Sequence, residues 1–364
     1  MVPSLPYSFS ATPAALAANV AKRLPELATL ERVLKGLHGR ARIEVEATVH
    51  RGDVEFPIYS VSIGSTDPKA PCLAILRGVH GLERIGSEVT IAWLQTLSEM
   101  LTWDRTLEQR LGTTRLCFMP IVNPIGMFLT KRANGNGVDL MRNAPVEAEE
   151  KPMFLVGGHR HSPRLPWFRG PGTTEGEMEV EAKAVISFVR REVFPSSASL
   201  AVDVHSGFGS MDRLWFPYAK TLRPPPHLAE ISALKRLFDR SYPNHFYKIE
   251  PQAKNYTTHG DLWDYLYEEQ LTAPGRGVFI PWTLELGSWL WLKKNPRQLF
   301  SSLGPFNPVQ PHRLQRILRR HLTLFDFLHR AVACAEAWTG LSAEGRRQLS
   351  SSALELWYER KQGG

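Results

Sequence analysis

Cysteine is scarce in this sequence of 364 residues, and its three cysteines, Cys72, Cys117 and Cys334, stand far apart. A disulfide framework usually needs an even number of cysteines, and a cysteine-based zinc site needs closely spaced pairs. Two of the three lie in apolar runs. We therefore expect reduced cysteines in the core of a cytoplasmic protein, and neither a disulfide framework nor a zinc site built from cysteine.

Long uncharged hydrophobic runs are missing as well. A membrane-spanning helix requires a stretch of about 18 apolar residues or more, and no such stretch occurs. A signal peptide has a basic segment followed by a compact hydrophobic block, and residues 1–24 lack this pattern. We therefore expect no signal peptide, no membrane partner and a cytoplasmic location.

The signature motifs of two large enzyme classes are also absent. No Gly-x-Ser-x-Gly occurs, which excludes a serine hydrolase built around a nucleophile elbow. No glycine-rich phosphate-binding loop ending in Lys-Ser or Lys-Thr occurs, which excludes a P-loop enzyme that uses ATP or GTP.

The formal net charge is +8, but the basic residues are spread along the chain. Their densest patch, residues 313–330, has apolar residues at helical spacing, namely Leu314, Ile317, Leu318, Leu322, Phe325 and Leu328. This pattern predicts a packed helix with a basic outer face. Because no nucleic-acid-binding motif accompanies it, we expect no nucleic-acid partner. The excess charge would still attract anionic substrates.

The chain alternates between patterns of buried strands and patterns of helices. Continuously apolar segments, typical of strands buried on both faces, occupy 70–78, 114–124, 199–207 and 278–287. Helical patterns occupy 86–101, 177–193, about 227–241 and most of 311–360. This order predicts an α/β fold with a mixed, mainly parallel central sheet flanked by helices.

Other segments complete the predicted organisation. Residues 12–37 predict a helix broken at Pro25, and residues 41–64 predict a hairpin. The glycine- and proline-rich stretches 123–176 and 243–261 predict long loops of the kind that often carry function. No linker-like change of composition divides the chain, so we expect one domain over 1–364.

Four ionisable residues follow the predicted buried strands. His80 and Glu83 come just after the first strand, His205 ends the third, and Glu285 lies near the end of the fourth. Ligands gather beyond the carboxyl ends of strands in such sheets. Taken alone, His80 and Glu83 would usually be polar loop residues, and His205 a core histidine. Their convergence instead favours a zinc site with two histidines, one carboxylate and an open position for water.

The ordered motifs "GVHGLE", "GVDLMRN", "DVHSG" and "TLELG" together resemble the zinc carboxypeptidase family, with its carboxypeptidase A-like (phosphorylase/hydrolase-like) fold. The glycine-rich "GVHGLERIGS" and "RANGNGVDL" are more similar to bacterial branches near the succinylglutamate desuccinylase and aspartoacylase group. These motifs cover residues of about 70–290, most of the chain.

The resemblance implies a role for each residue of the predicted centre. His80, Glu83 and His205 would bind one zinc ion per chain. Glu285 would be the general base that takes a proton from water and returns it to the leaving nitrogen. Asp139 would accept the other N–H of a ligand histidine and so fix its tautomer.

The resemblance also implies two further catalytic residues, Arg132 and Tyr256, and residues that bind the substrate. Arg132 would polarise the scissile carbonyl, although the adjacent Lys131 competes for this role. Arg142 would bind the substrate carboxylate, with Asn143 beside it. Tyr256 matches the mobile tyrosine of the family.

Two residues depart from the family pattern. Met141 stands where asparagine is usual, and the bulky Trp263 stands where a side chain lines the specificity pocket. Both departures predict weak activity on ordinary C-terminal residues and a preference for small or non-standard groups.

The loop at 157–172 adds two histidines and three arginines, which could form a second metal site, a basic substrate-binding loop or a flexible loop.

The predicted function is therefore a zinc-dependent hydrolase that cleaves a peptide or amide bond next to a substrate carboxylate. The substrate would be a small peptide or an N-acyl amino acid. Two alternatives stay open: a zinc-dependent N-acyl amino acid deacylase, and an inactive binding module with the same fold.

Overall fold

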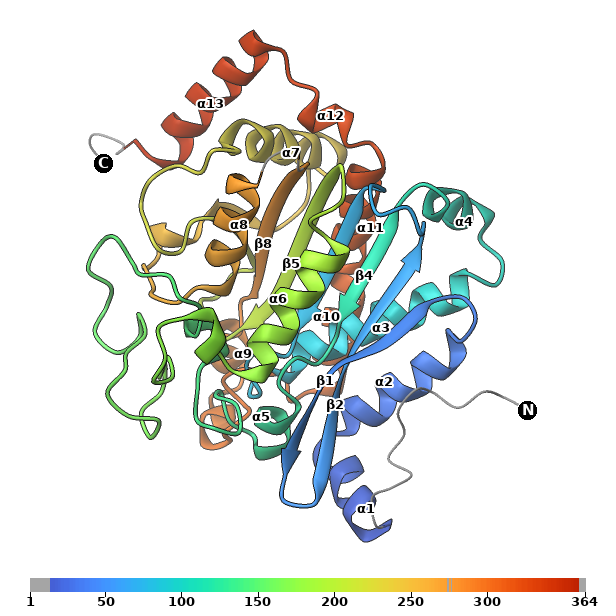
Figure 1. Ribbon diagram of the computed structural model, residues 1–364, viewed down its shortest axis with the longest axis vertical. Coiled ribbons are helices and arrows are strands. Elements are labelled where there is room, and N and C mark those ends of the chain that lie inside the picture. Colours follow the sequence, from blue (N-terminus) through green and yellow to red (C-terminus); the bar gives the residue numbers. More distant parts are fainter. Residues whose placement is uncertain (1–13, 274, 276, 360–364) are drawn as a thin grey trace.

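A computed structural model describes residues 14–273, 275 and 277–359. Within them, eight strands form one sheet in the order β1-β2-β4-β3-β5-β8-β6-β7 (Figure 1). The strands are β1 (Arg42–Arg51), β2 (Val54–Gly64), β3 (Cys72–Arg77), β4 (Arg115–Met119), β5 (Ala198–Ser206), β6 (Arg213–Phe216), β7 (Lys248–Pro251) and β8 (Val278–Leu286). The pairs β3–β4, β3–β5, β5–β8 and β6–β7 are parallel, and the other pairs are antiparallel. The predicted mixed, mainly parallel sheet is confirmed.

Helices cover both faces of this sheet. They are α1 (Ala14–Arg23), α2 (Pro25–Gly36), α3 (Arg84–Met100), α4 (Arg105–Leu111), α5 (Pro124–Leu129), α6 (Val180–Glu192), α7 (Leu228–Ser241), α8 (Leu262–Thr272), α9 (Trp289–Lys294), α10 (Pro311–Arg320), α11 (Leu322–Ala333), α12 (Glu336–Thr339) and α13 (Ala343–Trp357). Short 3₁₀ helices lie at Leu140–Arg142, Glu175–Glu177, Gln252–Lys254 and Pro296–Phe300. Helices α3 and α11 pack on β3 and β5 behind the sheet in Figure 1, whereas α6 lies in front of it.

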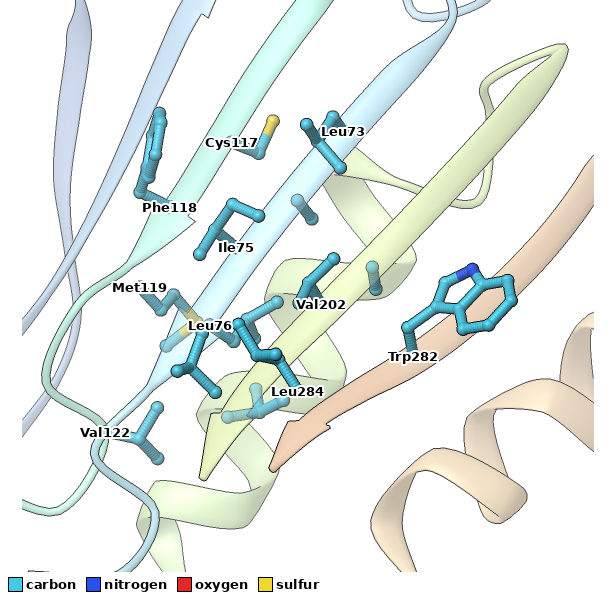
Figure 2. Close-up of a cluster of buried hydrophobic side chains, with 14 of the residues drawn as sticks. Leu73, Ile75, Leu76, Cys117, Phe118, Met119, Val122, Val202, Trp282 and Leu284 are labelled. Atoms are coloured by element: carbon cyan, nitrogen blue, oxygen red, sulfur yellow. The ribbon is translucent and has the colours of Figure 1, made fainter. Parts of the chain in front are cut away.

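The core lies between these layers. Strands β3, β4 and β5 are buried along their whole length, because apolar side chains point to both covered faces. Figure 2 shows neighbouring strands contributing to one cluster, with Ile75 on β3, Phe118 on β4, Val202 on β5 and Leu284 on β8. The four continuously apolar segments of the sequence thus form β3, β4, β5 and β8.

Of the smaller elements, the N-terminal helices and the hairpin were predicted, and two short elements were not. The N-terminal helix is broken at Pro25 into α1 and α2, as expected, while residues 12 and 13 lie outside the described residues. The hairpin is confirmed as β1 and β2. Strand β7 and helix α5 fall inside the stretches predicted as loops, because four to six residues are too few to show a clear periodicity.

The positions of the three cysteines agree only in part with the prediction. Cys72 and Cys117 are buried free thiols on adjacent strands. Cys334 is exposed, so its expected core position is wrong, because it follows the last residue of α11 and leaves that helix's buried face. None of the helices in the described ranges is long and apolar enough to cross a membrane.

Candidate metal centre

The strand register brings the predicted residues to one place. Strands β5 and β8 are parallel neighbours, and their register pairs His205 with Glu285. On the other side of β5, Leu76 of β3 pairs with Asp203. The chain that leaves β3 therefore emerges beside the end of β5, at the edge where ligands of such sheets bind.

Glycine lets the chain bend sharply after β3. Gly78 has a φ of +79°, in the left-handed region that favours glycine. A Cβ at Gly81 would lie 2.1 Å from the carbonyl carbon of Gly126, so the bend packs directly on the backbone of α5. The N–H of Glu83 donates to the carbonyl oxygen of His80 over 3.1 Å. This turn places the His80 and Glu83 side chains against each other.

His80, Glu83 and His205 form a compact buried group. Nδ1 of His80 lies 2.9 Å from Oε1 of Glu83, and Nδ1 of His205 lies 3.1 Å from Oε2. One ligand atom from each residue lies within 4.8 Å of the others. Two imidazole nitrogens and a carboxylate are the donor set of many catalytic zinc sites. The donors and their spacing therefore fit a zinc ion.

A second carboxylate holds each histidine from behind. Nε2 of His80 lies 2.9 Å from Oδ1 of Asp139, as predicted, and Nε2 of His205 lies 2.8 Å from Oδ2 of Asp203. Both aspartates are fully buried. Each imidazole thus presents Nδ1 to Glu83. Sequence reasoning assigned no role to Asp203, although its position two residues before His205 on one strand face was a usable signal.

Buried charges shape the protonation of the group. Burial alone would raise the pKa of Glu83, but His80, Arg77 and His205 hold it well below its ordinary range. Burial would lower the pKa of His205, but Asp203 and Glu83 raise it to about 10. A cation that binds here therefore displaces a proton. Arg77, whose Nη1 donates to Glu83 over 3.0 Å, was missed, although an arginine ending an apolar strand is an unusual feature.

Glu285 lies beside this group at the end of β8 and is 6% exposed. Its Oε1 accepts a hydrogen bond from the N–H of Phe208 over 2.9 Å. Burial and the nearby Glu83 raise the pKa of Glu285, while His205 opposes this effect. Its carboxylate lines the same cavity as the three candidate ligands. From this position it can exchange a proton with a water molecule.

Of Lys131 and Arg132, the two candidates for polarising the scissile carbonyl, only Arg132 faces the metal centre. Arg132 lines the cavity, and its Nε donates to Oδ2 of Asp139 over 2.8 Å. Lys131 is exposed. Asp139 therefore orients both His80 and Arg132, and it is the arginine that faces the centre.

The centre opens into a cavity of 590 Å³, a size typical of small-molecule sites. The predicted substrate-binding residues Met141 and Arg142 line it, and so does Tyr256, which was predicted to be catalytic. Arg142 is 3% exposed, and its Nη1 donates to the Met141 carbonyl oxygen over 3.1 Å. The Tyr256 ring packs near Phe208 and Trp215, with centroid distances of 5.9 and 6.0 Å, and burial raises the pKa of its phenol.

Two predicted substrate-binding residues do not line the cavity. Trp263 is buried, and its Nε1 donates to Oδ2 of Asp203 over 2.9 Å. It supports the metal centre from behind, because the first turn of α8 directs the indole toward β5. Asn143 donates to the Arg169 carbonyl oxygen and accepts from the Glu179 N–H, both over 2.8 Å. It therefore fixes loops, and neither Trp263 nor Asn143 contributes to the cavity wall, in contrast to the substrate contact predicted for both.

Asp261, two residues before Trp263, lines the cavity that Trp263 was predicted to line. Its Oδ1 caps α8 by accepting from the N–H groups of Trp263 and Asp264, both over 3.0 Å. Its Oδ2 is buried and has no hydrogen-bond partner in the described part of the chain, and burial raises the pKa of this carboxyl. Sequence reasoning missed it, because an aspartate before a helix has an ordinary capping role.

The loop at 157–172 contributes apolar side chains to the cavity. Pro166 and Trp167 line it. The ring nitrogens of His159 contact the Pro166 carbonyl oxygen and the His161 N–H, over 2.8 and 3.1 Å. Among the described residues of this loop no group of metal ligands is found, which disfavours a second metal site, and the basic side chains of the loop do not line the cavity, as a basic substrate-binding loop would require.

Comparisons with known proteins agree with this geometry. A family model described as zinc carboxypeptidase matches residues 14–287. The carboxypeptidase N catalytic chain of Rattus norvegicus is 30% identical over 187 residues, which cover 46% of this chain and 37% of that protein. Carboxypeptidase E of Caenorhabditis elegans is 26% identical over 140 residues, which cover 35% of this chain and 27% of that protein. The chain thus spans less than half the length of these relatives.

A solved structure supports the fold. Carboxypeptidase A from Helicoverpa armigera has a TM-score of 0.59 and 18% identity, and the match covers 84% of this chain and 72% of that one. At this identity the likeness shows a carboxypeptidase A-like fold and not a shared substrate. The narrower resemblance to desuccinylases and aspartoacylases stays a prediction.

Proposed function

The chain belongs to the zinc carboxypeptidase family, and from this premise we propose that it is a zinc-dependent hydrolase of a peptide or amide bond next to a substrate carboxylate. The observation that carries the proposal is that His80, Glu83 and His205 meet Glu285 at one cavity. Activity requires both a metal site and a base within reach of the same water molecule.

One zinc ion per chain would be held by Nδ1 of His80, the carboxylate of Glu83 and Nδ1 of His205. When bound, zinc lowers the pKa of water to about 7 and polarises a substrate carbonyl. Asp139 and Asp203 hold the outer nitrogens of the two imidazoles. They thereby fix the tautomer in which Nδ1 is available to the ion.

Glu285 acts as the general base in this proposal. The Phe208 N–H holds its Oε1, which leaves Oε2 to accept a proton from the attacking water. The same carboxyl then returns the proton to the leaving nitrogen. Its raised pKa suits a group that must both accept and release a proton near neutral pH.

The two cavity arginines have different tasks. Arg132, oriented by Asp139, stabilises negative charge on the scissile carbonyl oxygen. Arg142 binds the substrate carboxylate. Met141, which lines the cavity beside Arg142, offers no hydrogen bond to this carboxylate. An N-acyl amino acid deacylase is therefore the second candidate, because its substrate could be held differently. The complete set of ligands and base disfavours an inactive binding module.

We extend the proposal to the group next to the substrate carboxylate. Oδ2 of Asp261 is buried in the cavity wall without a partner among the residues that the structure describes, and such an oxygen destabilises the protein unless a ligand satisfies it. An ammonium or guanidinium group would do so. We expect a C-terminal Lys or Arg, in place of the small residue expected when Trp263 was assigned to the cavity.

Hydrolysis of peptides ending in Arg, Lys, Phe or Ala, and of N-acyl amino acids, tests the proposal. With zinc-loaded protein, kcat/KM should be highest for peptides ending in Arg or Lys. Asp261→Asn keeps the cap of α8 but loses the charge, so it should lower kcat/KM on these peptides by roughly 10- to 150-fold and change that of Ala-ending peptides by less than about threefold. An equal loss on all substrates would reject the role of Asp261. Exclusive cleavage of N-acyl amino acids would establish the deacylase.

A further inference from the structure

Residues 298–307, which we call the bridging segment, reach the metal centre from beyond the part of the chain that matches the family model, which ends at residue 287. Gln298 is 3% exposed and closes this segment on itself. Its Nε2 donates to the carbonyl oxygens of Gly304 and Asn307, over 3.0 and 3.2 Å. The segment is therefore a compact loop that carries Phe306 and Asn307 at its end.

Helix α3 begins directly after a candidate metal ligand. Glu83 is its N-cap residue, yet Glu83 makes no side-chain capping bond to the described residues of this helix. Its carboxylate instead contacts the two histidines and Arg77. The first N–H groups of a helix have no partner within the helix. Since Ile85 is fully buried, its N–H needs an acceptor from elsewhere in the chain.

Asn307 supplies that acceptor from 222 positions further along the chain. Its Oδ1 accepts from the Ile85 N–H over 2.9 Å. Its Nδ2 donates to the carbonyl oxygens of Leu82 and Leu303, over 2.7 and 2.9 Å. One amide side chain thus holds the backbone on both sides of Glu83.

The neighbouring Phe306 holds the other ligand-bearing segment. Its carbonyl oxygen accepts from Oγ of Ser206 over 2.8 Å, and the Ser206 N–H donates to Oε2 of Glu83 over 3.0 Å. A Cβ at Gly207 would lie 3.0 Å from the Phe306 ring, so the ring packs closely on the end of β5. Two adjacent residues of the bridging segment therefore join the bend after β3 to the end of β5.

We propose that Asn307 is a positioning residue for the metal centre, because it caps α3 in place of Glu83 and leaves the Glu83 carboxylate turned toward the two histidines. Without this amide, the Ile85 N–H loses its acceptor, and the Glu83 carboxylate can turn back to cap its own helix. The affinity for zinc then falls, as it commonly does by about 10- to 100-fold when the support of a metal ligand is lost. The inference rests on the proposed function in taking zinc as the ligand.

The zinc dissociation constant of Asn307→Ala, measured by competition with a chelator, tests the proposal without any measurement of activity. Asp104→Ala is the matched control, because Asp104 caps α4, which carries no candidate ligand, by accepting from the N–H groups of Thr106 and Leu107. Both variants should lower the urea midpoint of the zinc-free protein. Asn307→Ala should weaken zinc binding by about 10- to 100-fold, whereas Asp104→Ala should change it by less than about threefold. Asn307→Asp retains an acceptor for Ile85 and should recover most of the affinity.

Each outcome is decisive. Zinc binding by Asn307→Ala within about threefold of wild type overturns the proposal, and so does an equal loss in Asp104→Ala. If the alanine variant does not fold, Asn307→Ser, whose side chain is too short to reach Ile85, is interpreted in the same way. An Asn307→Asp variant that binds zinc no better than the alanine or serine variant also overturns it. Failure of the wild-type chain to bind zinc would instead reject the proposed function.

Discussion

At the scale of single residues, the metal centre uses most side chains more than once. Glu83 contacts both histidines and Arg77, and Asp139 orients both His80 and Arg132. In such a shared network, a substitution at one residue disturbs several partners. The clearest tests therefore change residues that line the cavity but are not candidate metal ligands.

Glu285→Gln should retain zinc and lose most turnover, because an amide cannot accept the proton of water. A positioned general base contributes roughly 10²- to 10⁴-fold, so kcat should fall by that factor while the zinc content stays at the wild-type value. Parallel measurements of kcat and zinc content check this. Near-normal turnover would remove Glu285 from the mechanism.

Arg132→Ala should lower kcat by about 10²- to 10³-fold, the usual effect of removing one donor to a developing oxyanion. Lys131→Ala is the adjacent control and should leave kcat within about twofold, because Lys131 is exposed. Steady-state kinetics on one peptide compare the two variants. A larger loss in Lys131→Ala than in Arg132→Ala would assign the task to the lysine.

The sequence allowed the candidate ligands and the base to be predicted, because each follows a continuously apolar strand and the order of motifs is specific. Arg132, Arg142 and Tyr256 also line the cavity as predicted. Trp263 does not line the cavity as predicted, and Asp261, which does, was missed. The two residues stand at one helix start, where a shift of two positions decides which side chain faces the cavity and which faces the core. That choice depends on the direction of α8, which the sequence does not give.

At the scale of elements, α11 and the residue before it carry two buried histidines, His329 and His321, which are not among the candidate ligands. His321 contacts the Tyr247 hydroxyl over 2.8 Å, and His329 contacts the Thr114 hydroxyl over 2.9 Å. Burial lowers the pKa of each histidine to about 3, with a smaller contribution from Arg320 at His321 and from Arg110 at His329. Both are therefore neutral in the folded protein throughout the mildly acidic range.

These histidines should make the fold sensitive to acid. In the unfolded chain each binds a proton below its ordinary pKa of 6.5, whereas in the folded chain each does so only near 3. The stabilisation is complete above pH 6.5 and is lost as the pH falls toward 3. When the pH is lowered from 7 to 5, the free energy of unfolding should therefore fall by about 2 kcal/mol for each of the two histidines.

Urea unfolding of His329→Gln at pH 7 and pH 5 checks this prediction. The difference in unfolding free energy between the two pH values should be about 2 kcal/mol smaller than in wild type. His38→Gln is the control, because His38 is exposed, and should leave the difference unchanged. The same difference in wild type and His329→Gln would contradict the account.

The long strands and helices were predictable because their apolar periods extend over enough residues. The short strands β6 and β7 were not, since strands of four residues are ordered by their neighbours in the sheet and not by a pattern of their own. The loop at 157–172 was recognised by its histidines and arginines. Its cavity-facing residues are instead Pro166 and Trp167, whereas the ring of His159 is buried and contacts the backbone of the same loop.

At the scale of the whole molecule, residues that are more than 200 positions apart in the sequence, from His80 to Asn307, converge on one sheet edge. The candidate ligands come from the ends of β3 and β5, the candidate base from β8, and the bridging segment from beyond residue 287, where the match to the family model ends. The candidate ligands and base thus lie within the part that matches the family model, whereas the proposed support by Asn307 comes from the segment that follows it.

The zinc content of the purified protein tests the central claim most directly. After dialysis against metal-free buffer, elemental analysis should find about one zinc ion per wild-type chain and almost none in His205→Ala. The far-UV circular dichroism of His205→Ala should stay close to that of wild type, because the centre is a small part of a large core. A folded wild-type chain without stoichiometric zinc, or a His205→Ala variant with full zinc occupancy, would contradict the account.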